Sequence, residues 1–350
     1  MKAAVWYGNK DIRLEDRPID ELGPDEVQIK VMAVGICGTD MHEWWAGPIF
    51  MPVDEPHPLT GKKAPLTAGH EFSGVISAVG SAVKGFKVGD RVTSDSATWC
   101  GVCENCQKGW HSLCEKVAFL GLSRDGAFAE FVNVPAAPVV KLPDNVSFEW
   151  GAMVEPFAVA VHAHRRARTQ VGENIVVIGA GTIGLMAIHV AKIAGVAKIF
   201  AVEVSEKRKA AAAALGAIVL DPSKDDVEAA VLSQTGNRGA DIVMEIVGKQ
   251  ETVDLALSLP CTRGRVVIVG IFEEPITVDW NKIVMNELEV LGHLNNGGEI
   301  PQVIELMADG RLDAEPFITG RIGLSEVVEK GYEELISDKS HIKILVDPSK

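Results

Sequence analysis

From about residue 174 to residue 292, short apolar runs rich in β-branched residues alternate with segments whose apolar positions recur at helical spacing. Alternation of this kind is typical of βαβ units and a buried parallel sheet. The pattern predicts strands at Ile175–Ile178, Lys198–Val202, Ile218–Leu220, Ile242–Glu245 and Arg265–Val269, and helices at Thr182–Ala194, Ser205–Leu215, Asp225–Gln234 and Gln250–Leu259.

The first 150 residues follow a different pattern, in which short alternating segments are broken by glycine and proline. Glu26–Val34 alternates as a strand does, Val75–Val79 predicts another strand, and Arg91-Val92 follows a turn at Gly89-Asp90. The sequence therefore predicts a β-rich region ahead of the α/β region. In the last part of the chain we expect a helix at Ile300–Ala308 and a strand at Ile342–Val346.

Composition and charge limit the possible functions. A length of 350 residues indicates about two domains. Lys and Arg number 34 against 48 Asp and Glu, so the net charge is −14, which argues against a nucleic-acid or anionic-membrane partner because both need a basic surface. The longest uncharged run, the 18 residues between Glu173 and Lys192, contains three glycines and fits a buried strand–turn–helix better than a membrane span. Nothing after Met1 resembles a signal peptide, so we expect a cytoplasmic protein.

A glycine motif, G-x-G-x-x-G, begins at Gly179, directly after an expected strand and at the start of an expected helix. Gly179 allows the tight turn, Gly181 lets a pyrophosphate approach the backbone, and Gly184 permits close helix–strand packing. Thr182 and Ile183 open the helix, whose free N–H groups suit an anion. The motif predicts a dinucleotide site, although glycines at such a turn can be purely structural.

The residue that follows the second strand of this region bears on the choice of dinucleotide. Glu203 lies 22 residues after Gly181, where a carboxylate binds the adenosine ribose hydroxyls. A 2′-phosphate facing that carboxylate would be repelled, so NAD is favoured over NADP. Lys207 and Arg208 keep NADP possible, and Arg208 is a further candidate for cofactor binding; both could equally be residues of a solvated helix face.

Four of the six cysteines crowd into 15 residues, at Cys100, Cys103, Cys106 and Cys114. In a large chain without a secretory signal, such a cluster indicates a metal site rather than disulfides. Four thiolates close a tetrahedron around zinc and leave no open position, so we expect a structural site. A zinc ribbon for nucleic acid is the alternative, and the net charge opposes it.

A second set of possible ligands is dispersed along the chain. Cys37 lies in a C-G-T-D motif, His70 in G-H-E, and Glu155 precedes a proline; taken alone they would be a buried thiol, a satisfied histidine and a surface acid. The series G-H-E-x2-G-x5-G-x2-V that begins at Gly69, however, resembles the zinc signature of the zinc-containing medium-chain alcohol dehydrogenases. The C-G-T-D motif, the four cysteines, K-V-G-D-R-V from Lys87, Glu-Pro and the glycine motif occur in that family's order, and the resemblance spans nearly the whole chain.

The resemblance implies an α/β protein with two domains. A GroES-like, β-rich catalytic domain would comprise residues 1–153 and 293–350, with a structural zinc lobe at about 95–116. A Rossmann domain with a doubly wound parallel sheet would comprise residues 154–292. Family members are dimers or tetramers, so we expect a homo-oligomer, with two zinc ions per chain.

Within the family the chain resembles the polyol branch, which includes sorbitol, threonine and (R,R)-2,3-butanediol dehydrogenases and has Glu155-Pro156 in place of a third cysteine ligand. The longer interval between Cys37 and His70 resembles the butanediol members most closely. The resemblance therefore implies reversible, NAD-linked oxidation of a secondary alcohol in a small vicinal diol such as 2,3-butanediol. Sorbitol and L-threonine are the alternative substrates, and a dinucleotide-binding protein without activity is the alternative from another class.

Roles for individual residues follow from the same resemblance. Cys37 and His70 would bind the catalytic zinc together with Glu71 or Glu155, and the branch differs on which carboxylate coordinates. Asp40 would hold His70 in its tautomer. Thr39 would accept the proton of the substrate hydroxyl, and His42 would pass it outward, although His42 could equally be an exposed loop residue. Four aromatic residues could line a substrate pocket or simply pack: Trp44, Trp45, Phe50 and Phe157.

Overall fold

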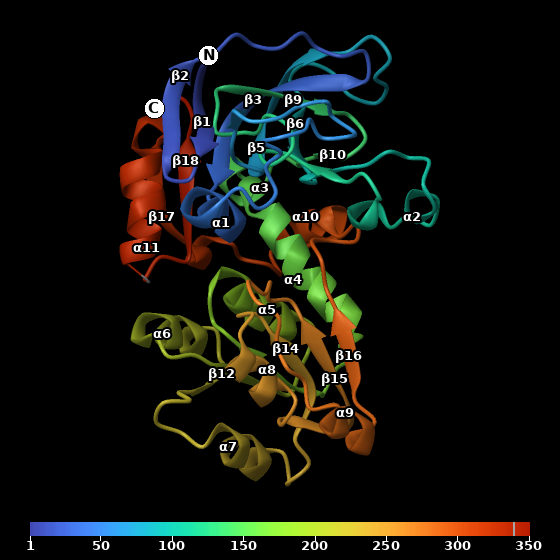
Figure 1. Cartoon of the computed structure of the whole chain (residues 1–350), viewed down its shortest axis with the longest axis vertical. Coiled ribbons are helices and arrows are strands. Elements are labelled where there is room, and N and C mark those ends of the chain that lie inside the picture. Colours follow the sequence, from blue (N-terminus) through green and yellow to red (C-terminus); the bar gives the residue numbers. More distant parts are fainter. Residues whose placement is uncertain (339) are drawn as a thin grey trace. The chain divides into compact units, whose positions relative to one another are not determined.

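The computed structural model describes residues 1–338 and 340–350. The chain forms two compact units, one of Met1–Glu155 with Gly297–Lys350 and the other of Pro156–Asn296 (Figure 1). The first unit therefore contains both ends of the chain. Within the described residues, no helix combines the length and the apolar character that crossing a membrane requires.

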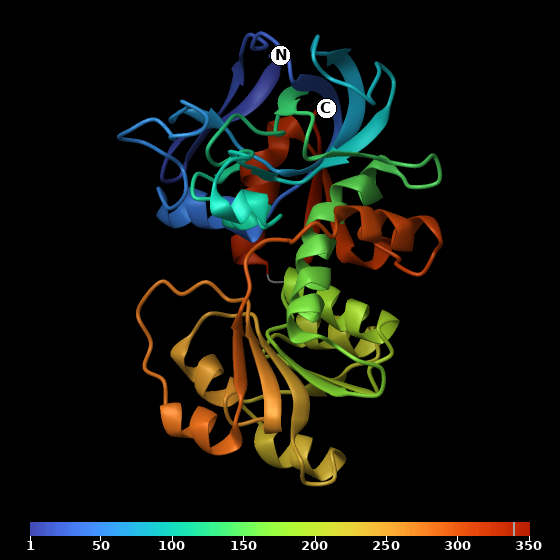
Figure 2. The same cartoon turned by 90° about the vertical axis from the view of Figure 1, so that its right-hand side faces the viewer.

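The second unit is built on the parallel sheet that the alternating pattern predicts. Its strands run in the order β13-β12-β11-β14-β15-β16, and every neighbouring pair is parallel. The central strands β11 and β14 are almost entirely buried, because helices cover both faces; in Figure 2 the green and the gold helices lie on opposite sides of the strands. The strands are β11 (Asn174–Ile178), β12 (Lys198–Val202), β13 (Ile218–Leu220), β14 (Ala240–Glu245), β15 (Pro260–Ile268) and β16 (Glu289–Gly292). The helices are α4 (Val154–Ala167), α5 (Thr182–Ile193), α6 (Glu206–Ala214), α7 (Val227–Gln234), α8 (Gln250–Ala256) and α9 (Trp280–Asn286).

The first unit is mainly β-structure. A larger sheet runs β10-β6-β5-β3-β18-β17, with β9 also paired to β3, and smaller sheets are formed by β2-β1-β4 and β7-β8. Its strands are β1 (Lys2–Gly8), β2 (Asp11–Asp16), β3 (Glu26–Gly35), β4 (Leu66–Thr67), β5 (Glu71–Val79), β6 (Arg91–Ser94), β7 (Ala97–Thr98), β8 (Ala118–Phe119), β9 (Phe131–Pro135), β10 (Val139–Lys141), β17 (Ile318–Gly323) and β18 (Lys343–Asp347). Its helices are α1 (Gly38–Ala46), α2 (Glu104–Gln107), α3 (Phe148–Ala152), α10 (Ile300–Ala308) and α11 (Glu334–Ser337), with 3₁₀ turns at His111–Leu113, Glu315–Phe317 and Leu324–Glu326 and a π-helix at Val327–Glu333.

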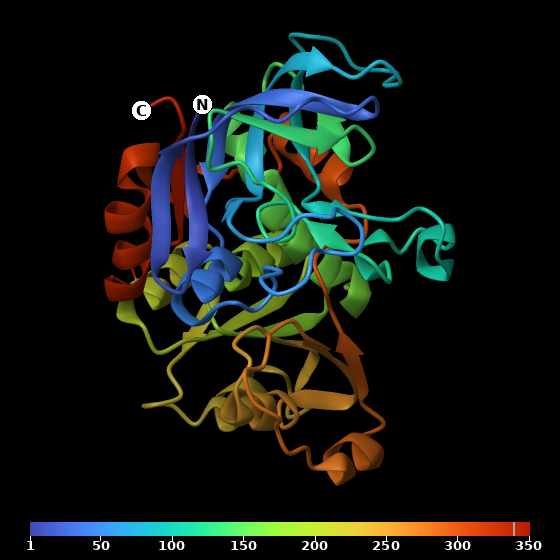
Figure 3. The ribbon, with the colours of Figure 1, turned by 45° about the horizontal axis from the view of Figure 1, so that its top comes forward.

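The C-terminal segment returns to the first unit and completes its sheet. β18 pairs antiparallel with β3, with Leu345 opposite Gly35 and Val346 opposite Val34, and parallel with β17. Figure 3 shows these red strands beside the blue N-terminal strands. Two strands of this sheet, β17 and β18, therefore come from the last part of the chain.

One expected strand begins earlier than the pattern predicts. Val75–Val79 is the second half of β5, which starts at Glu71, and Gly35 of β3 pairs with Glu71. The alternation does not reveal this start because Glu71 and Ser73 are polar, yet both are buried. Their polar groups are satisfied inside the fold: Ser73 donates to the Phe148 carbonyl, and Glu71 accepts from a buried lysine.

Candidate metal centres and dinucleotide site

The first candidate site begins at the N-terminus of α1. Cys37 is the N-cap residue, and its Sγ accepts a hydrogen bond from the Thr39 backbone N–H at 3.5 Å. Asp40 closes the reciprocal bond, because its Oδ2 accepts from the Cys37 N–H at 2.9 Å. The C-G-T-D motif thus fixes the thiol at the end of β3, where the chain turns into the helix.

Antiparallel pairing of β3 with β5 brings the G-H-E motif to the same place. His70 lies just before β5 and Glu71 is its first residue. One ligand atom from each of Cys37, His70 and Glu71 lies within 4.8 Å of the others. Gly35 is required here, since a Cβ on it would lie 2.4 Å from Glu71 Oε2. A thiol, an imidazole and a carboxylate are donors that suit zinc.

The surroundings of His70 also suit a cation. His70 Nδ1 lies 3.5 Å from Asp40 Oδ1, and both buried atoms lack a hydrogen-bond partner of good geometry. Burial alone would lower the pKa of His70, but the charges of Asp40 and Cys37 raise the pKa well above its usual value. With Nδ1 facing Asp40, Nε2 is the ring nitrogen left for a metal.

A residue that the sequence analysis missed completes this group. Lys343 of β18 is buried, and its Nζ donates to Glu71 Oε1 at 2.8 Å, to Glu71 Oε2 at 2.6 Å and to the Ile36 carbonyl at 2.9 Å. All three ammonium protons are therefore used. Burial lowers the pKa of Lys343, and the attraction of Glu71 outweighs it and raises the pKa. The pattern of β18 alone gives no signal of this role, because the partner lies 272 positions away.

Glu155, the other expected carboxylate ligand, is also buried in the first unit. It follows the first residue of α4, and its Oε1 accepts from Ser96 Oγ at 2.9 Å. Burial raises the pKa of Glu155 to about 7, with His70 lowering it and Glu71 raising it further. Glu155 is outside the group whose ligand atoms lie within 4.8 Å, whereas Glu71 is inside but paired with Lys343. The third metal ligand is therefore still predicted to be either Glu71 or Glu155.

The expected proton-transfer residues lie on α1. Thr39 Oγ1 is 3.7 Å from Cys37 Sγ, so it lies at the edge of the candidate centre. His42 is exposed three positions further along the same helix. Of the four aromatic candidates, two are buried packing residues, Trp44 and Phe157, and two are largely exposed, Trp45 and Phe50.

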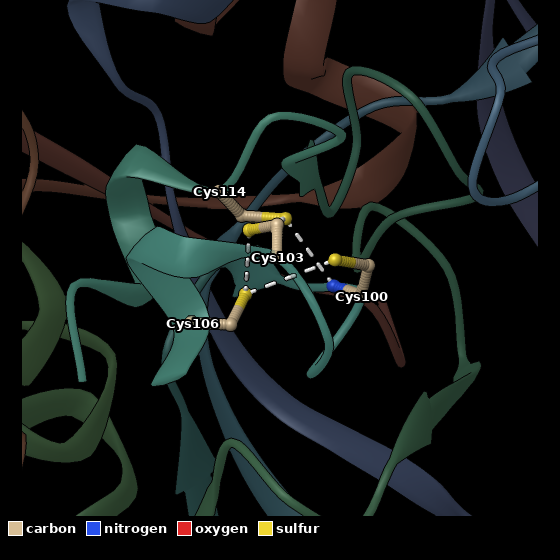
Figure 4. A group of neighbouring side chains, drawn as sticks. All are labelled: Cys100, Cys103, Cys106 and Cys114. Atoms are coloured by element: carbon tan, nitrogen blue, oxygen red, sulfur yellow. Dashed lines mark hydrogen bonds between the residues drawn. The ribbon is translucent and has the colours of Figure 1, made fainter. Parts of the chain in front are cut away.

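The four cysteines of the local cluster point toward one another (Figure 4). Cys103 Sγ lies 3.4 Å from Cys106 Sγ and 4.0 Å from Cys114 Sγ, and Cys100 Sγ lies 3.9 Å from Cys106 Sγ. The four ligand atoms fall within 4.8 Å of one another. The short helices α2 and 111–113 and the turns between them provide this arrangement.

Local charges in the lobe show what a metal would contribute. Backbone N–H groups of Val102 and Cys103 lower the pKa of Cys100 to about 6, whereas burial raises the pKa of Cys106 to about 12. A divalent cation supplies the charge that the buried thiolate lacks. The geometry and the donors thus fit a closed four-thiolate zinc site.

In the second unit the glycine motif takes the conformation that its sequence requires. Gly179 has φ +95°, which favours glycine, and a Cβ at Gly184 would lie 1.8 Å from the Gly179 carbonyl oxygen. Gly181 is the N-cap residue of α5, and Thr182 and Ile183 form its first turn. The N–H groups at this helix start lie at the carboxyl end of β11, where an anion binds in such sheets.

The expected ribose-binding carboxylate lies beside this motif. Glu203 follows β12 and is buried; its Oε2 accepts from the Ala180 N–H at 2.9 Å, and its Oε1 accepts from the N–H groups of Val204 and Ser205. Arg208 Nη1 lies 4.0 Å from Glu203 Oε2 and near Gly181. The structure therefore brings Gly179, Gly181, Glu203 and Arg208 to one edge of the sheet.

Comparison with known proteins decides the family. Residues 23–144 match the alcohol dehydrogenase GroES-like domain, and residues 182–309 match the zinc-binding dehydrogenase domain. The chain is 42% identical to the (R,R)-butanediol dehydrogenase of Bacillus subtilis (strain 168) over all of both chains. The chain belongs to the zinc-binding alcohol dehydrogenase family. It is also 35% identical to a sorbitol dehydrogenase of the same organism, over 100% of this chain and 98% of that protein.

Solved structures agree with this assignment. The crystal structure of 2R,3R-butanediol dehydrogenase from Bacillus subtilis superimposes with a TM-score of 0.95 at 42% identity, covering 99% of each chain. A zinc-binding dehydrogenase from Sinorhizobium meliloti 1021, bound to NADP, superimposes with a TM-score of 0.89 at 32% identity, covering 99% of each chain. The expected fold, a GroES-like domain with a Rossmann domain, is confirmed. The chain is an oxidoreductase with zinc and a nicotinamide dinucleotide as cofactors.

Proposed function

We propose that this dehydrogenase catalyses the reversible, NAD-linked oxidation of a secondary alcohol within a small vicinal diol, with (R,R)-2,3-butanediol and acetoin as the substrate pair. The observation that carries the proposal is the group of partly buried Cys37 with buried His70 and Glu71, found in a chain that is 42% identical over its full length to a butanediol dehydrogenase. A reaction on a hydroxyl group needs an electrophile beside it, and this group is built to hold one.

Cys37, His70 and one of the carboxylates Glu71 and Glu155 would hold the catalytic zinc. Bound there, zinc supplies the Lewis acidity that lowers the pKa of the substrate hydroxyl. Asp40, whose Oδ1 lies 3.5 Å from His70 Nδ1, would keep the His70 ring in one orientation and one tautomer. The four cysteines of the lobe would hold the second zinc, with no position left for a substrate.

The chain's own residues provide a route for the proton. Thr39, whose Oγ1 lies 3.7 Å from Cys37 Sγ, would accept the hydroxyl proton of the substrate. His42 is three positions further along α1, so the two side chains lie on the same face of the helix. Since His42 is exposed, it can release the proton to water.

NAD is the proposed cofactor. The ribose of the adenosine half would compete for Glu203 with the backbone N–H groups that now bind it. The carboxylate is buried and anionic groups are repelled by it, so a 2′-phosphate is disfavoured at this position. Arg208, with part of its side chain exposed, lies close enough to bind the same end of the cofactor.

The experiment is a substrate panel with NAD and NADP on the zinc-loaded protein. It includes both butanediol stereoisomers, acetoin, sorbitol, xylitol and L-threonine. We expect the largest kcat/KM for (R,R)-2,3-butanediol with NAD and for acetoin with NADH. A larger kcat/KM for sorbitol or threonine contradicts the substrate, and turnover of none of these compounds supports a dinucleotide-binding protein without this activity.

Sorbitol is the second candidate substrate, favoured by the 35% identity to a sorbitol dehydrogenase.

We also propose a homodimer or homotetramer acting in the cytoplasm. β16 is an edge strand of its sheet. The neighbouring helix α9 exposes three apolar side chains, Trp280, Val284 and Met285. Both features support self-association. Light scattering measures the oligomeric state directly.

A further inference from the structure

Glu245 is a buried carboxylate to which the proposed reaction assigns no role. It is the last residue of β14, and its side chain has 0% of its surface exposed. Its Oε1 accepts three hydrogen bonds of 2.8 Å, from the N–H groups of Val247 and Gly248 and from Thr252 Oγ1. Its Oε2 is buried without a hydrogen-bond partner. Half of this carboxylate is therefore unsatisfied inside the protein.

Hydrogen bonding explains the position of Glu245 but does not require a carboxylate there. A glutamine would offer the same oxygen to the same three donors without bringing a charge into the interior. In residues 1–338 and 340–350, no lysine, arginine or histidine forms an ion pair with Glu245. A buried charge without a cation is costly to folding, so its presence calls for a compensating interaction.

Glu245 lies on the opposite side of the glycine motif from Glu203. The strand order is β12-β11-β14, so the two carboxylates end the strands on either side of the motif. The Ile246 N–H donates to the Ile178 carbonyl, and Val247 Cγ2 lies over Gly179, since a Cβ on that glycine would be 2.6 Å from it. Glu245 is thus joined directly to the first turn of the motif.

The same residue also holds the next loop along the sheet edge. Its backbone carbonyl accepts from the N–H groups of Val269 and Gly270, and a Cβ on Gly270 would lie 2.6 Å from Glu245 Oε2. The two loops end in exposed apolar side chains, Val247 at 39% and Ile271 at 64%. The unsatisfied oxygen therefore lies beside Gly270, at the carboxyl ends of β14 and β15.

A dinucleotide crosses the glycine motif with one half on each side of it. With the adenosine half at Glu203, the nicotinamide half would lie on the other side of the motif, toward the carboxyl ends of β14 and β15. The nicotinamide ring carries a positive charge in NAD⁺ and none in NADH. A fixed negative charge in a low-dielectric interior therefore interacts with only one of the two redox states.

We propose that the buried charge of Glu245 acts through space on the nicotinamide ring and favours bound NAD⁺ over bound NADH. The inference rests on the proposed dinucleotide site, and it goes beyond that site because it concerns the relative affinity for the two redox states. Glu245 touches neither the substrate nor the reacting atoms and is a tuning residue. Its effect extends to the equilibrium between the two redox states on the enzyme.

The test compares the Glu245→Gln variant with the unaltered zinc enzyme. Dissociation constants for NAD⁺, NADH and ADP-ribose are measured by calorimetry or fluorescence without substrate. We expect the ratio Kd(NAD⁺)/Kd(NADH) to rise about fivefold to tenfold in the variant, because the attraction between the carboxylate and the charged ring of NAD⁺ is lost. The Kd of ADP-ribose, which lacks the nicotinamide, stays within about twofold. Equal weakening of all three ligands, or an unchanged ratio, overturns the proposal.

Two further variants separate charge from structure. Glu251→Gln removes an exposed carboxylate from α8, the helix that carries Thr252, and leaves the ratio unchanged. Glu245→Asp keeps the buried charge, so its ratio stays near that of the unaltered enzyme even if its overall affinity falls; a ratio shifted as in the glutamine variant contradicts the proposal. If the unaltered enzyme binds no ADP-ribose, the dinucleotide site itself is wrong, which is a different failure.

Discussion

The two cysteine-containing centres of the first unit differ in how the chain builds them. The lobe takes four identical ligands from 15 consecutive residues, and the short helices and turns between those cysteines are enough to bring their sulfurs together. The other centre brings together a thiol, an imidazole and a carboxylate from residues 37, 70 and 71, and adds the ammonium of Lys343. The first centre is local, and the second exists only when the sheet is complete.

This difference separates a structural role from a chemical one. A closed set of four thiolates leaves no position for a substrate. The dispersed centre is largely buried, mixes ligand types and pairs its carboxylate with a buried lysine, so its charge depends on several parts of the fold. Changes in the lobe should therefore alter stability, whereas changes in the dispersed centre should alter turnover.

The strongest way to break this comparison is to remove Cys37. In Cys37→Ala we expect turnover to fall on the order of a thousandfold or more, because the substrate hydroxyl loses its electrophile. Zinc analysis should give one zinc per chain instead of two, with the lobe still loaded. Full activity, or unchanged zinc content, would show that the dispersed residues are not a metal centre.

Removing a lobe cysteine should lower stability and leave turnover nearly unchanged. In Cys100→Ala we expect zinc to fall to one per chain and the thermal midpoint to fall by about 5 to 15 °C, because the four-thiolate site contributes to folding. At temperatures where the variant is folded, kcat should stay within about threefold. The separation of the two roles fails if turnover is lost while the thermal midpoint is unchanged.

The local features of the molecule could be predicted from the sequence. The parallel sheet follows from the alternation, since central strands buried on both faces are mainly apolar, as β11 is from Ile175 to Ile178. The Gly179 turn and the cysteine lobe follow from spacing, because their partners lie within a few residues. The dispersed centre could be predicted only through the family resemblance, because spacing gives no signal that residues 37 and 70 meet.

The sequence pattern could not predict which charged residues are buried. Lys343 and Glu71 are polar residues at buried positions of two strands, which an apolar pattern assigns to the outside. Glu245 looks like the ordinary end of a strand, and its burial becomes visible only when the loops after β14 and β15 are seen around it. The Lys343–Glu71 pair depends on strands far apart in the sequence, whereas Glu245 accepts its side-chain hydrogen bonds from residues within seven positions of it.

The buried pair offers a test of how far the dispersed centre depends on the C-terminal segment. In Lys343→Met, Glu71 keeps its burial and loses its cation, so we expect about 3 to 5 kcal/mol less stability in urea unfolding. The double variant Lys343→Met with Glu71→Gln removes both charges and should recover most of the stability.

An exposed lysine of the same segment provides the control for this pair. Lys350 pairs with Asp347 at the surface, and its side chain is 75% exposed. Lys350→Met should change stability by less than about 0.5 kcal/mol. Equal effects at the two lysines would show that the dispersed centre does not depend on the buried pair.

A second buried histidine, His164, shows how the neighbours of a buried ring determine its pKa. His164 of α4 is buried like His70, with Nε2 bonded to the Ala187 carbonyl and Nδ1 to Thr169 Oγ1, both at 2.9 Å. It has no carboxylate or thiolate beside it among the described contacts, so burial lowers the pKa of His164 to about 4. His70, beside Asp40 and Cys37, has a raised pKa. Burial alone therefore excludes a cation, and the dispersed centre attracts one through its anionic neighbours.

This contrast predicts a pH dependence of stability. Between about pH 6.5 and pH 4 the unfolded chain protonates His164 and the folded chain does not, so its contribution to stability is lost as the pH falls, by up to about 3 kcal/mol. His164→Gln cannot titrate. Its stability deficit against the unaltered protein, measured by urea unfolding, should therefore be about 2 to 3 kcal/mol smaller at pH 4.5 than at pH 7.5. An equal deficit at both pH values would show that the buried ring protonates as freely in the folded protein as in the unfolded chain, and burial would no longer distinguish His164 from the metal-centre histidine.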